Sequence, residues 1–319
     1  MRENGPTKGV VFVEITDACN YECRHCYLGK LPSLNEENTR LEEIRHAFDS
    51  LEGIAVNEIR FTGGEPMLAQ SLAPMVEMCR TRGISYTIVS NGSGFRRENL
   101  EAIVSYPPRR IWLSLYAADE GRHDQMTASA GSFRRLNQTI ALLRNRGIQY
   151  GIHLVVWPNL VGHLMECLDL AFGEMQAAEI KCIPIQAAGA ALDSSARLVL
   201  NAEEMERVRR ELQTWCGTNR NRLVRVAGVL GQPEGAITGC MFQERVFLTI
   251  NHRGKISPCC LLMHDENWVF SGVSEALESA RKVTGKGLPC ASGKCGVCPL
   301  LLTDPSYEAD LCSSSPFNS

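Results

Sequence analysis

The feature that most restricts the fold of this chain is a regular alternation of strand-like and helix-like segments between residues 10 and 185. Short runs rich in β-branched and apolar residues are each followed by a segment with apolar residues at helical spacing. This alternation predicts an α/β fold with a parallel sheet, and six units fit either an open doubly wound sheet or an incomplete barrel. The strands are expected at Val10–Ile15, Glu58–Phe61, Ser85–Val89, Arg110–Leu115, Gln149–Trp157 and Glu179–Ile185.

The pattern changes after residue 185. Small residues crowd Ala187–Ser195, which is typical of a loop or linker, and a charged helix is expected at Ala202–Thr214. Further on, Val246–Ile250 and Lys255–Ser257 flank a four-residue turn that contains glycine, which predicts a β-hairpin. We therefore expect a barrel domain at residues 1–185 and a small α+β module at residues 186–319, a division that fits a length of 319 residues.

Charge and hydropathy exclude several classes of function. The 33 lysines and arginines nearly balance the 36 acidic residues, and a net charge of -3 gives no electrostatic reason to expect nucleic acid as a partner. No apolar run is long enough for a membrane span, and the N-terminal residues lack the apolar stretch of a signal peptide. We therefore expect a cytoplasmic protein with reduced thiols.

The chain has 14 cysteines, and clustered cysteines in a reduced protein favour metal binding or catalysis over disulfides. One group lies near the N-terminus and a larger group lies in the last third of the chain. Four cysteines are isolated in apolar segments, where free cysteine often acts as a small buried hydrophobic residue. These four are Cys79, Cys167, Cys182 and Cys216.

The first group, Cys19-x3-Cys23-x2-Cys26, directly follows the first expected strand. Three thiolates this close must come from one loop to face a common centre. Structural metal sites usually take four protein ligands, so three leave an open coordination position, as catalytic metals need. The alternative is a zinc loop completed by His25 or a distant residue.

The segment CNYECRHCY resembles the cluster loop of the radical S-adenosylmethionine (radical SAM) superfamily. The resemblance implies a partial (β/α)6 TIM-like barrel in which Cys19, Cys23 and Cys26 hold a 4Fe–4S cluster. It further implies that the open iron chelates SAM, and that one electron from a flavodoxin- or ferredoxin-type reductant cleaves SAM to methionine and a 5′-deoxyadenosyl radical.

Further matches to this superfamily follow successive strands, at the edge where parallel barrels build active sites. Phe61-Thr62-Gly63-Gly64-Glu65-Pro66 is similar to the segment that lies against the SAM amino group, where glycines permit close approach and a carboxylate complements an ammonium. Ser114 begins a pattern that is Ser-x-Asp in many relatives, but Tyr116 replaces the acid here. Ordinary turn chemistry is the alternative for the residues after the third to fifth strands. The SAM-binding residues implied are Tyr27, Gly63, Gly64, Glu65, Ser90, Asn91, Ser114 and Asn159.

The second cysteine group suggests a closed metal site. Cys240 and Cys259 flank the expected hairpin, and Cys295 and Cys298 form a CxxC pair. Four thiolates suit either zinc or an iron–sulfur cluster. The region resembles the SPASM and twitch modules of radical SAM enzymes, which implies one auxiliary 4Fe–4S cluster, because seven cysteines are one short of the eight that two clusters need. The alternative ligands are Cys290 and Cys312.

Cys260 is the candidate catalytic residue. Adjacent residues in extended backbone point to opposite sides, so Cys260 faces away from the cluster if Cys259 binds it. A thiol there could give a hydrogen atom to a carbon radical, although a packed thiol or a spare ligand is the alternative.

The segments SPCC and CGVC resemble radical SAM epimerases that invert residues in ribosomally made peptides. The resemblance implies that the adenosyl radical removes a hydrogen atom from a C–H centre and that Cys260 returns one to the opposite face. The alternatives are an epimerase or dehydrogenase of an aminoglycoside or aminocyclitol sugar, and a zinc-binding module without enzymatic activity. Arg122-His123-Asp124, expected in a loop at the barrel mouth, would contact substrate or solvent.

Overall fold

The computed structural model describes residues 8–36, 39–51, 55–185, 187–194, 197–226, 247–258, 263–264, 266–282 and 309–310. Within these residues, ten strands form a single sheet in the order β10-β7-β6-β5-β4-β3-β2-β1-β8-β9. Every neighbouring pair from β7 to β8 in this order is parallel, while β10 and β9 add antiparallel edges. The first six strands are β1 (Lys8–Glu14), β2 (Ala55–Thr62), β3 (Ser85–Ser90), β4 (Arg110–Leu115), β5 (Tyr150–Val156) and β6 (Ile180–Pro184).

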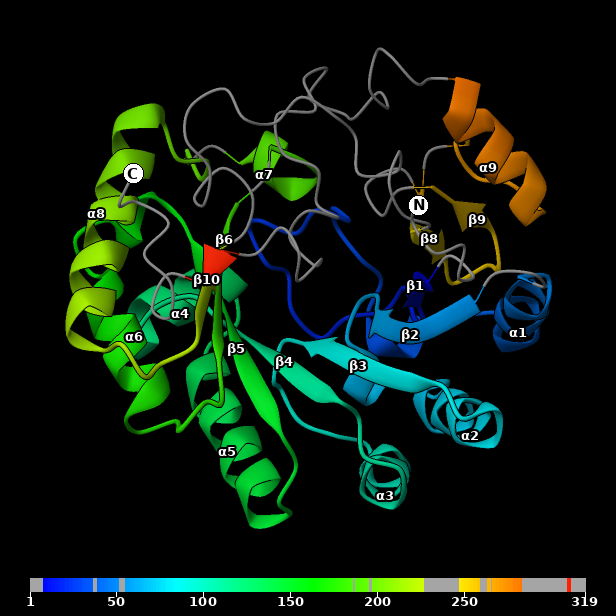
Figure 1. Cartoon of the computed structure of the whole chain (residues 1–319), viewed down its shortest axis with the longest axis horizontal. Helices are drawn as coiled ribbons and strands as arrows, with labels where there is room; N and C mark the ends of the chain where they lie inside the picture. Colours follow the sequence, from blue (N-terminus) through cyan, green and yellow to red (C-terminus); the bar gives the residue numbers. More distant parts are fainter. Residues whose placement is uncertain are drawn as a thin grey trace, which may run out of the picture.

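The sheet curves into an arc with helices along its outer side (Figure 1). This arrangement confirms the partial TIM-like barrel and excludes the open doubly wound alternative, in which helices would cover both faces. Helices follow the barrel strands as the alternation predicts, and α4 lies where a loop was expected. They are α1 (Leu41–Asp49), α2 (Leu72–Arg82), α3 (Arg97–Ser105), α4 (Glu120–Thr127), α5 (Ser132–Asn145) and α6 (Leu164–Phe172).

Segments beyond residue 185 continue the same sheet. The short strand β7 (Val224–Val226) pairs with β6, and β8 (Phe247–Ile250) pairs with β1. The expected hairpin is confirmed, because β9 (Ile256–Ser257) runs antiparallel to β8. The remaining elements are α7 (Ala190–Asp193), which was expected to be linker, α8 (Ala202–Thr218), α9 (Val273–Lys282) and β10 (Ala309–Asp310).

The second cysteine group lies outside the described residues. It comprises Cys240, Cys259, Cys260, Cys290, Cys295, Cys298 and Cys312.

Side chains of β4 point alternately to the apolar core and to the inner side of the arc. In β4, Ile111, Leu113 and Leu115 are fully buried in the hydrophobic core. Arg110, Trp112 and Ser114 alternate with them and are only partly buried. Because successive side chains of a strand point to opposite faces, the final polar residue, Ser114, faces the inner side at the carboxyl end of the sheet.

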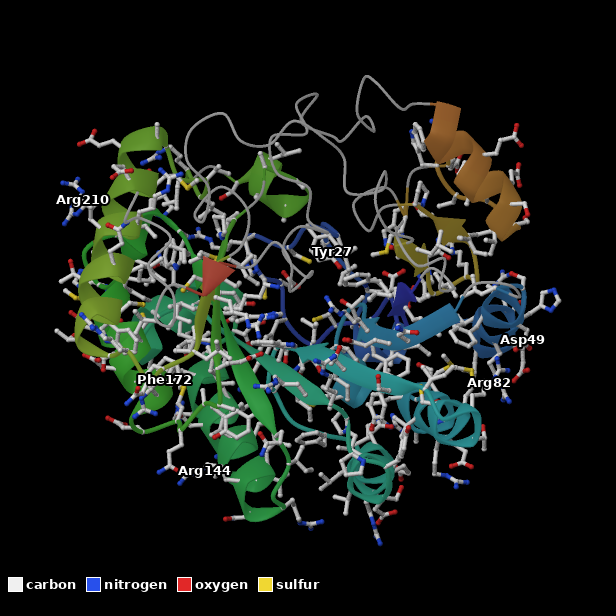
Figure 2. The ribbon with its side chains drawn as sticks, viewed as in Figure 1. Tyr27, Asp49, Arg82, Arg144, Phe172 and Arg210 are labelled. Atoms are coloured by element: carbon white, nitrogen blue, oxygen red, sulfur yellow. The ribbon has the colours of Figure 1, made fainter. Side chains whose placement is uncertain are left out.

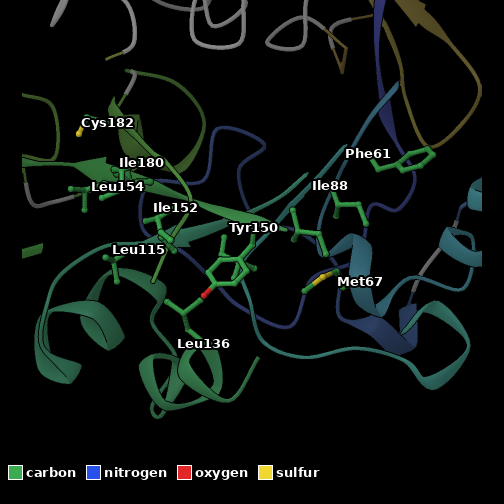
Figure 3. Close-up of a cluster of buried hydrophobic side chains, with 14 of the residues drawn as sticks. Phe61, Met67, Ile88, Leu115, Leu136, Tyr150, Ile152, Leu154, Ile180 and Cys182 are labelled. Atoms are coloured by element: carbon green, nitrogen blue, oxygen red, sulfur yellow. The ribbon is translucent and has the colours of Figure 1, made fainter. Parts of the chain in front are cut away.

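The hydrophobic core fills the space between strands and helices (Figure 3). Ile152, Leu154 and Ile180 from neighbouring parallel strands pack together, as expected for strands buried on both faces. Among the isolated cysteines, Cys79, Cys167 and Cys182 are buried free thiols, which confirms their interpretation as core residues. Cys216 is also buried but is disulfide-bonded, so its expected free thiol was wrong.

Asn99 on α3 joins the backbone segments behind β2. Its side-chain amide donates to the carbonyls of Met67 and Ala69 and accepts from the Ala73 amide, and the residue is 1% exposed. We expect Asn99→Ala to lower the free energy of unfolding by about 3 kcal/mol, because buried backbone groups lose their partners. Asn137→Ala, which removes one bond to Phe133 on α5, should cost less than about 1 kcal/mol. Urea unfolding measures both, and equal effects would contradict this role for Asn99.

Candidate active site

A cavity of about 490 Å³ opens at the carboxyl ends of the strands, inside the arc. Its volume lies in the range of small-molecule and cofactor sites. Tyr27, which Figure 2 places on this inner side, is one of the lining residues. The cavity brings together ten residues that the sequence predicted, namely Cys19, Cys23, Cys26, Tyr27, Gly63, Gly64, Ser90, Asn91 and Ser114, together with His25, the alternative zinc ligand.

The loop that carries the three cysteines begins directly after β1 and folds back on itself. The Cys26 amide donates to the Cys23 carbonyl (3.1 Å), and the Cys19 amide donates to the Pro32 carbonyl (3.0 Å). These bonds turn three thiols from eight consecutive residues toward one space, and all three thiols are free and half-buried. A single loop therefore presents a three-sulfur face to the cavity, as the spacing predicted.

Gly63 and Gly64 let the segment after β2 lie directly against the start of this loop. The amides of Gly64 and Glu65 donate to the carbonyls of Thr16 and Ala18, each at 2.9 Å. A Cβ on Gly64 would stand 1.9 Å from the Ala18 carbonyl oxygen, and one on Gly63 would stand 2.3 Å from that of Thr16. No side chain fits in either place, so the glycines are required for backbone contact as well as for access to a ligand.

The Glu65 carboxylate has a different position from the one expected. The residue is fully buried and does not line the cavity. Its oxygens accept from the Met67 amide (2.9 Å), the Ser90 hydroxyl (2.7 Å) and the Asn91 amide (2.7 Å). Burial outweighs these bonds and raises the pKa of Glu65 to about 7. Glu65 therefore joins the loops after β2 and β3. Its carboxylate does not line the cavity, where the sequence predicted a contact with the SAM amino group.

The residues after β3 and β4 lie at the cavity as expected. The Asn91 amide nitrogen Nδ2 donates to Asn20 in the cysteine loop (3.0 Å) and lies 3.8 Å from the Cys19 sulfur. Ser114 and Tyr116 both line the cavity, and the Tyr116 ring packs against His25 at 4.9 Å. Tyr116 thus forms an aromatic part of the cavity wall.

Two sets of residues predicted from the sequence do not line the cavity. Asn159 is exposed in a short 3-10 helix at Pro158–Leu160 and does not line the cavity. Arg122, His123 and Asp124 lie on α4 rather than in a loop. His123 is fully buried, and the Asp124 carboxylate accepts from the Phe133 amide at 2.9 Å at the start of α5. This triplet therefore organises the junction of α4 and α5 and does not reach the cavity.

Sequence reasoning missed several cavity residues. Arg24 and Lys30 line the cavity from within the cysteine loop, and Ala190 and Ser194 line it from α7 and its C-terminal end. The Ala190 amide donates to the Cys26 carbonyl (2.8 Å), so α7 covers the cysteine loop. The two cations could have been found from their positions between and after the cysteines. The role of α7 could not, because it depends on a contact between distant parts of the chain.

The three thiols suit a metal that is bound as thiolate. Burial raises the pKa of Cys19 to about 12 and raises the pKa values of Cys23 and Cys26 as well, so the free thiols are protonated at neutral pH. Bound iron would replace these protons, since thiolates are the ligands of iron–sulfur clusters. The His25 ring packs on Tyr116, and its buried Nδ1 has no hydrogen-bond partner among the described residues. The donor set therefore fits an iron–sulfur cluster with one open iron.

Comparisons with known proteins show a family and several relatives. The model of the Radical SAM superfamily matches residues 13–171. An AdoMet-dependent heme synthase from Nitratidesulfovibrio vulgaris is 23% identical, with 99% of this chain and 95% of that protein covered. The subtilosin biosynthesis protein AlbA of Bacillus subtilis is 29% identical over 50% of this chain and 35% of its own length. A PqqA peptide cyclase from Xanthomonas oryzae is 24% identical over 83% of this chain and 71% of its own length.

Solved structures show the same fold. SuiB of Streptococcus suis, crystallised with S-adenosylmethionine, has a TM-score of 0.65 at 15% identity, covering 83% of this chain and 63% of SuiB. The AdoMet-bound structure of anSMEcpe has a TM-score of 0.64 at 17% identity, covering 86% of this chain and 77% of that protein. Within the described residues, no helix has the length and hydropathy needed to cross a membrane. The chain therefore contains a radical SAM domain, which spans residues 13–171.

Proposed function

We propose that this enzyme is a radical SAM epimerase that inverts a C–H centre in a ribosomally made peptide. The observation that carries the proposal furthest is the cavity in which three cysteines of one loop face two glycines and the polar ends of β3 and β4. In this proposal Cys19, Cys23 and Cys26 bind a 4Fe–4S cluster and leave one iron open. Tyr27, Gly63, Gly64, Ser90, Asn91 and Ser114 surround SAM.

Asn159 and Glu65 do not line the cavity that would hold SAM. Asn159 is exposed and does not line the cavity, so its contact with SAM stays a prediction from the sequence. Glu65 acts by holding Ser90 and Asn91 in place. We therefore propose Glu65 as a positioning residue for SAM.

When bound, the cluster and SAM supply, with one electron from a flavodoxin- or ferredoxin-type protein, a 5′-deoxyadenosyl radical that takes a hydrogen atom from substrate. In the proposal, the Cys260 thiol gives a hydrogen atom to the opposite face of the substrate radical and becomes a thiyl radical. One further electron and one proton restore the thiol. Each inversion then consumes one SAM and two electrons.

The proposed module at residues 186–319 supplies the thiol and a route for the second electron. Cys240, Cys259, Cys295 and Cys298 would hold an auxiliary 4Fe–4S cluster of the twitch type, with Cys290 and Cys312 as alternative ligands. The support for this part is the sequence pattern together with the β8–β9 hairpin, which leads through Pro258 directly to Cys259.

A peptide substrate is supported by the names of several relatives. AlbA is a bacteriocin biosynthesis protein, and the PqqA cyclase is named for a peptide substrate. SuiB has also been crystallised with its precursor peptide. The sugar substrate that the sequence left open, an aminoglycoside or aminocyclitol, can be tested by the same uptake of deuterium from D2O that is described below for a peptide.

A second candidate is an AdoMet-dependent step in haem formation. It is favoured by the heme synthase from N. vulgaris, which aligns over nearly the full length of both chains. Arg24 and Lys30 at the cavity could bind the carboxylates of a tetrapyrrole. An epimerase returns hydrogen to carbon and leaves the mass of its substrate unchanged, whereas a synthase that forms a new compound need not return it. The fate of the substrate hydrogen therefore separates the two candidates.

Gly64→Ala tests the proposed cluster loop. A Cβ would overlap the Ala18 carbonyl next to Cys19, so we expect the variant to lose most iron at this site and to stop cleaving SAM. Gly217→Ala on α8 is the control, because no atom lies within 4 Å of its Cβ position, and iron content should stay unchanged. Iron analysis and 5′-deoxyadenosine formation measure the effect. Full iron loading in Gly64→Ala would contradict this packing argument.

The number of clusters is tested by anaerobic reconstitution. Two 4Fe–4S clusters predict about eight irons per chain and a broad absorbance near about 400 nm. Replacing Cys295 and Cys298 with alanine should leave about four irons and preserve SAM cleavage at the first cluster. Zinc without a visible chromophore would refute the enzyme, and four irons in the unaltered chain would refute the auxiliary cluster.

Cys260→Ala tests the reaction type. In D2O the product should gain one deuterium at the inverted carbon, because the Cys260 thiol exchanges with solvent. The variant should still form 5′-deoxyadenosine but should lose inversion. Mass spectrometry of a candidate precursor peptide, with amino-acid chirality analysis, reports both results. Inversion at the normal rate in Cys260→Ala would overturn the proposal.

A further inference from the structure

We propose that Glu14 is a positioning residue that holds the chain on both sides of Cys259 and Cys260 against the rim of the barrel. The inference rests on the epimerase function proposed above, because it concerns the placement of the thiol that returns hydrogen. It assigns to Glu14, His252 and His264 a role that none of the superfamily motifs in the sequence indicates.

Glu14 lies between the cavity and the hairpin. It is the last residue of β1, five residues before Cys19, and is fully buried. Its Cγ lies 3.2 Å from the place where a Cβ on Gly63 would stand, and Gly63 lines the cavity. The side chain is therefore directly behind the wall of the proposed SAM site.

Two segments separated in sequence by the cysteine pair donate to this carboxylate. Oxygen Oε2 accepts from the backbone amide of His252 (3.0 Å) and from its ring nitrogen Nδ1 (2.8 Å). Oxygen Oε1 accepts from Nε2 of His264 (3.0 Å). His252 belongs to the turn of the β8–β9 hairpin, while His264 lies four residues after Cys260. One buried carboxylate thus binds the chain before and after the pair.

The hairpin turn itself is rigidly docked. The Asn251 side chain accepts from the amides of Arg253 and Lys255 and donates to the Met263 carbonyl at 2.8 Å. A Cβ on Gly254 would stand 2.4 Å from the Glu43 carbonyl oxygen, so the turn lies directly on α1. β8 also pairs with β1, so the hairpin is joined to the barrel sheet. Met263 and His264 therefore bind to a part of the chain that the barrel holds in place.

Electrostatics support a charged anchor. Burial opposes ionisation of Glu14, but the hydrogen bonds and charges of His252 and His264 outweigh it and lower the pKa of Glu14 to about 2. Burial also disfavours the charged form of His264, which would lower its pKa, but the bond to Glu14 outweighs burial and raises the pKa of His264. A buried carboxylate with charge-assisted donors is a strong local restraint, since breaking such a bond leaves a buried charge without a partner.

Because the anchor binds His252 and His264, which lie on either side of the cysteine pair in the sequence, its loss should displace the thiol more than the cluster loop. A hydrogen atom is transferred only over a short distance, and a displacement of about 1 Å can cost up to about 100-fold in rate. Without the anchor, SAM cleavage should continue while inversion becomes inefficient.

The experiment compares Glu14→Gln with Glu42→Gln on α1, whose side chain is 80% exposed, in the fully reconstituted enzyme. We expect Glu14→Gln to reduce inverted product per 5′-deoxyadenosine by at least about tenfold, with SAM cleavage near the unaltered rate. His264→Ala should show the same uncoupling. His264→Gln should recover part of the coupling, because its amide can still donate to Glu14. Backbone hydrogen exchange at residues 247–258 and 263–264 should accelerate in Glu14→Gln and His264→Ala only.

Three results would overturn the inference. Normal coupling in both Glu14→Gln and His264→Ala would show that the contact does not position the thiol. Unchanged hydrogen exchange in both variants would show that it holds neither segment. One zinc per chain that both variants lose would replace the hydrogen-bonded anchor with a metal site, since the ligand atoms of the three residues lie within 4.8 Å of one another. If the unaltered enzyme cleaves SAM but inverts nothing, the proposed function fails separately, and hydrogen exchange still tests the anchor.

Discussion

The arrangement of this site depends on the contact between the start of the cysteine loop and the turn after β2. Two backbone hydrogen bonds of 2.9 Å join these segments at a separation that leaves no room for a Cβ on Gly63 or Gly64. This contact fixes where the loop leaves β1, and hence where the three thiols face. It also places the two glycines on the cavity wall, so the same residues that permit the backbone contact leave space for a ligand.

Two buried carboxylates connect this region to further segments of the chain. Glu65 accepts hydrogen bonds from neutral donors and links the turn after β2 to Ser90 and Asn91 beside the cavity, and burial raises its pKa to about 7. Glu14 accepts from two histidines beyond residue 250, and these outweigh burial to lower its pKa to about 2. The residues beside the proposed SAM site and the segments on either side of the proposed thiol are therefore held by carboxylates that do not themselves line the cavity.

The sequence predicted the barrel strands and the hairpin from local patterns and, with the resemblance to the radical SAM superfamily, ten of the 21 residues that line the cavity. The resemblance indicated Ser114, which the alternation of β4 places on the inner face, and cysteine spacing predicted three thiols on one loop. Interactions between distant segments were not predictable in this way. GGEP suggested that Glu65 faces a ligand, but its carboxylate is used by Ser90 and Asn91. Arg122-His123-Asp124 lacks strong apolar periodicity and was expected to be a loop, although buried His123 and the capping role of Asp124 stabilise α4 and α5. Nothing local to Glu14 indicated its partners some 240 residues later.

The central claim is that Cys19, Cys23 and Cys26 hold a cluster whose open iron binds SAM in the cavity beside Gly63 and Gly64. Electron–nuclear double resonance on the reduced enzyme, with SAM labelled at its amino nitrogen with nitrogen-15, tests this claim most directly. Our account predicts a hyperfine coupling between the cluster and the labelled nitrogen that disappears in Cys23→Ala. A reduced cluster that shows no coupling to bound, labelled SAM would contradict it.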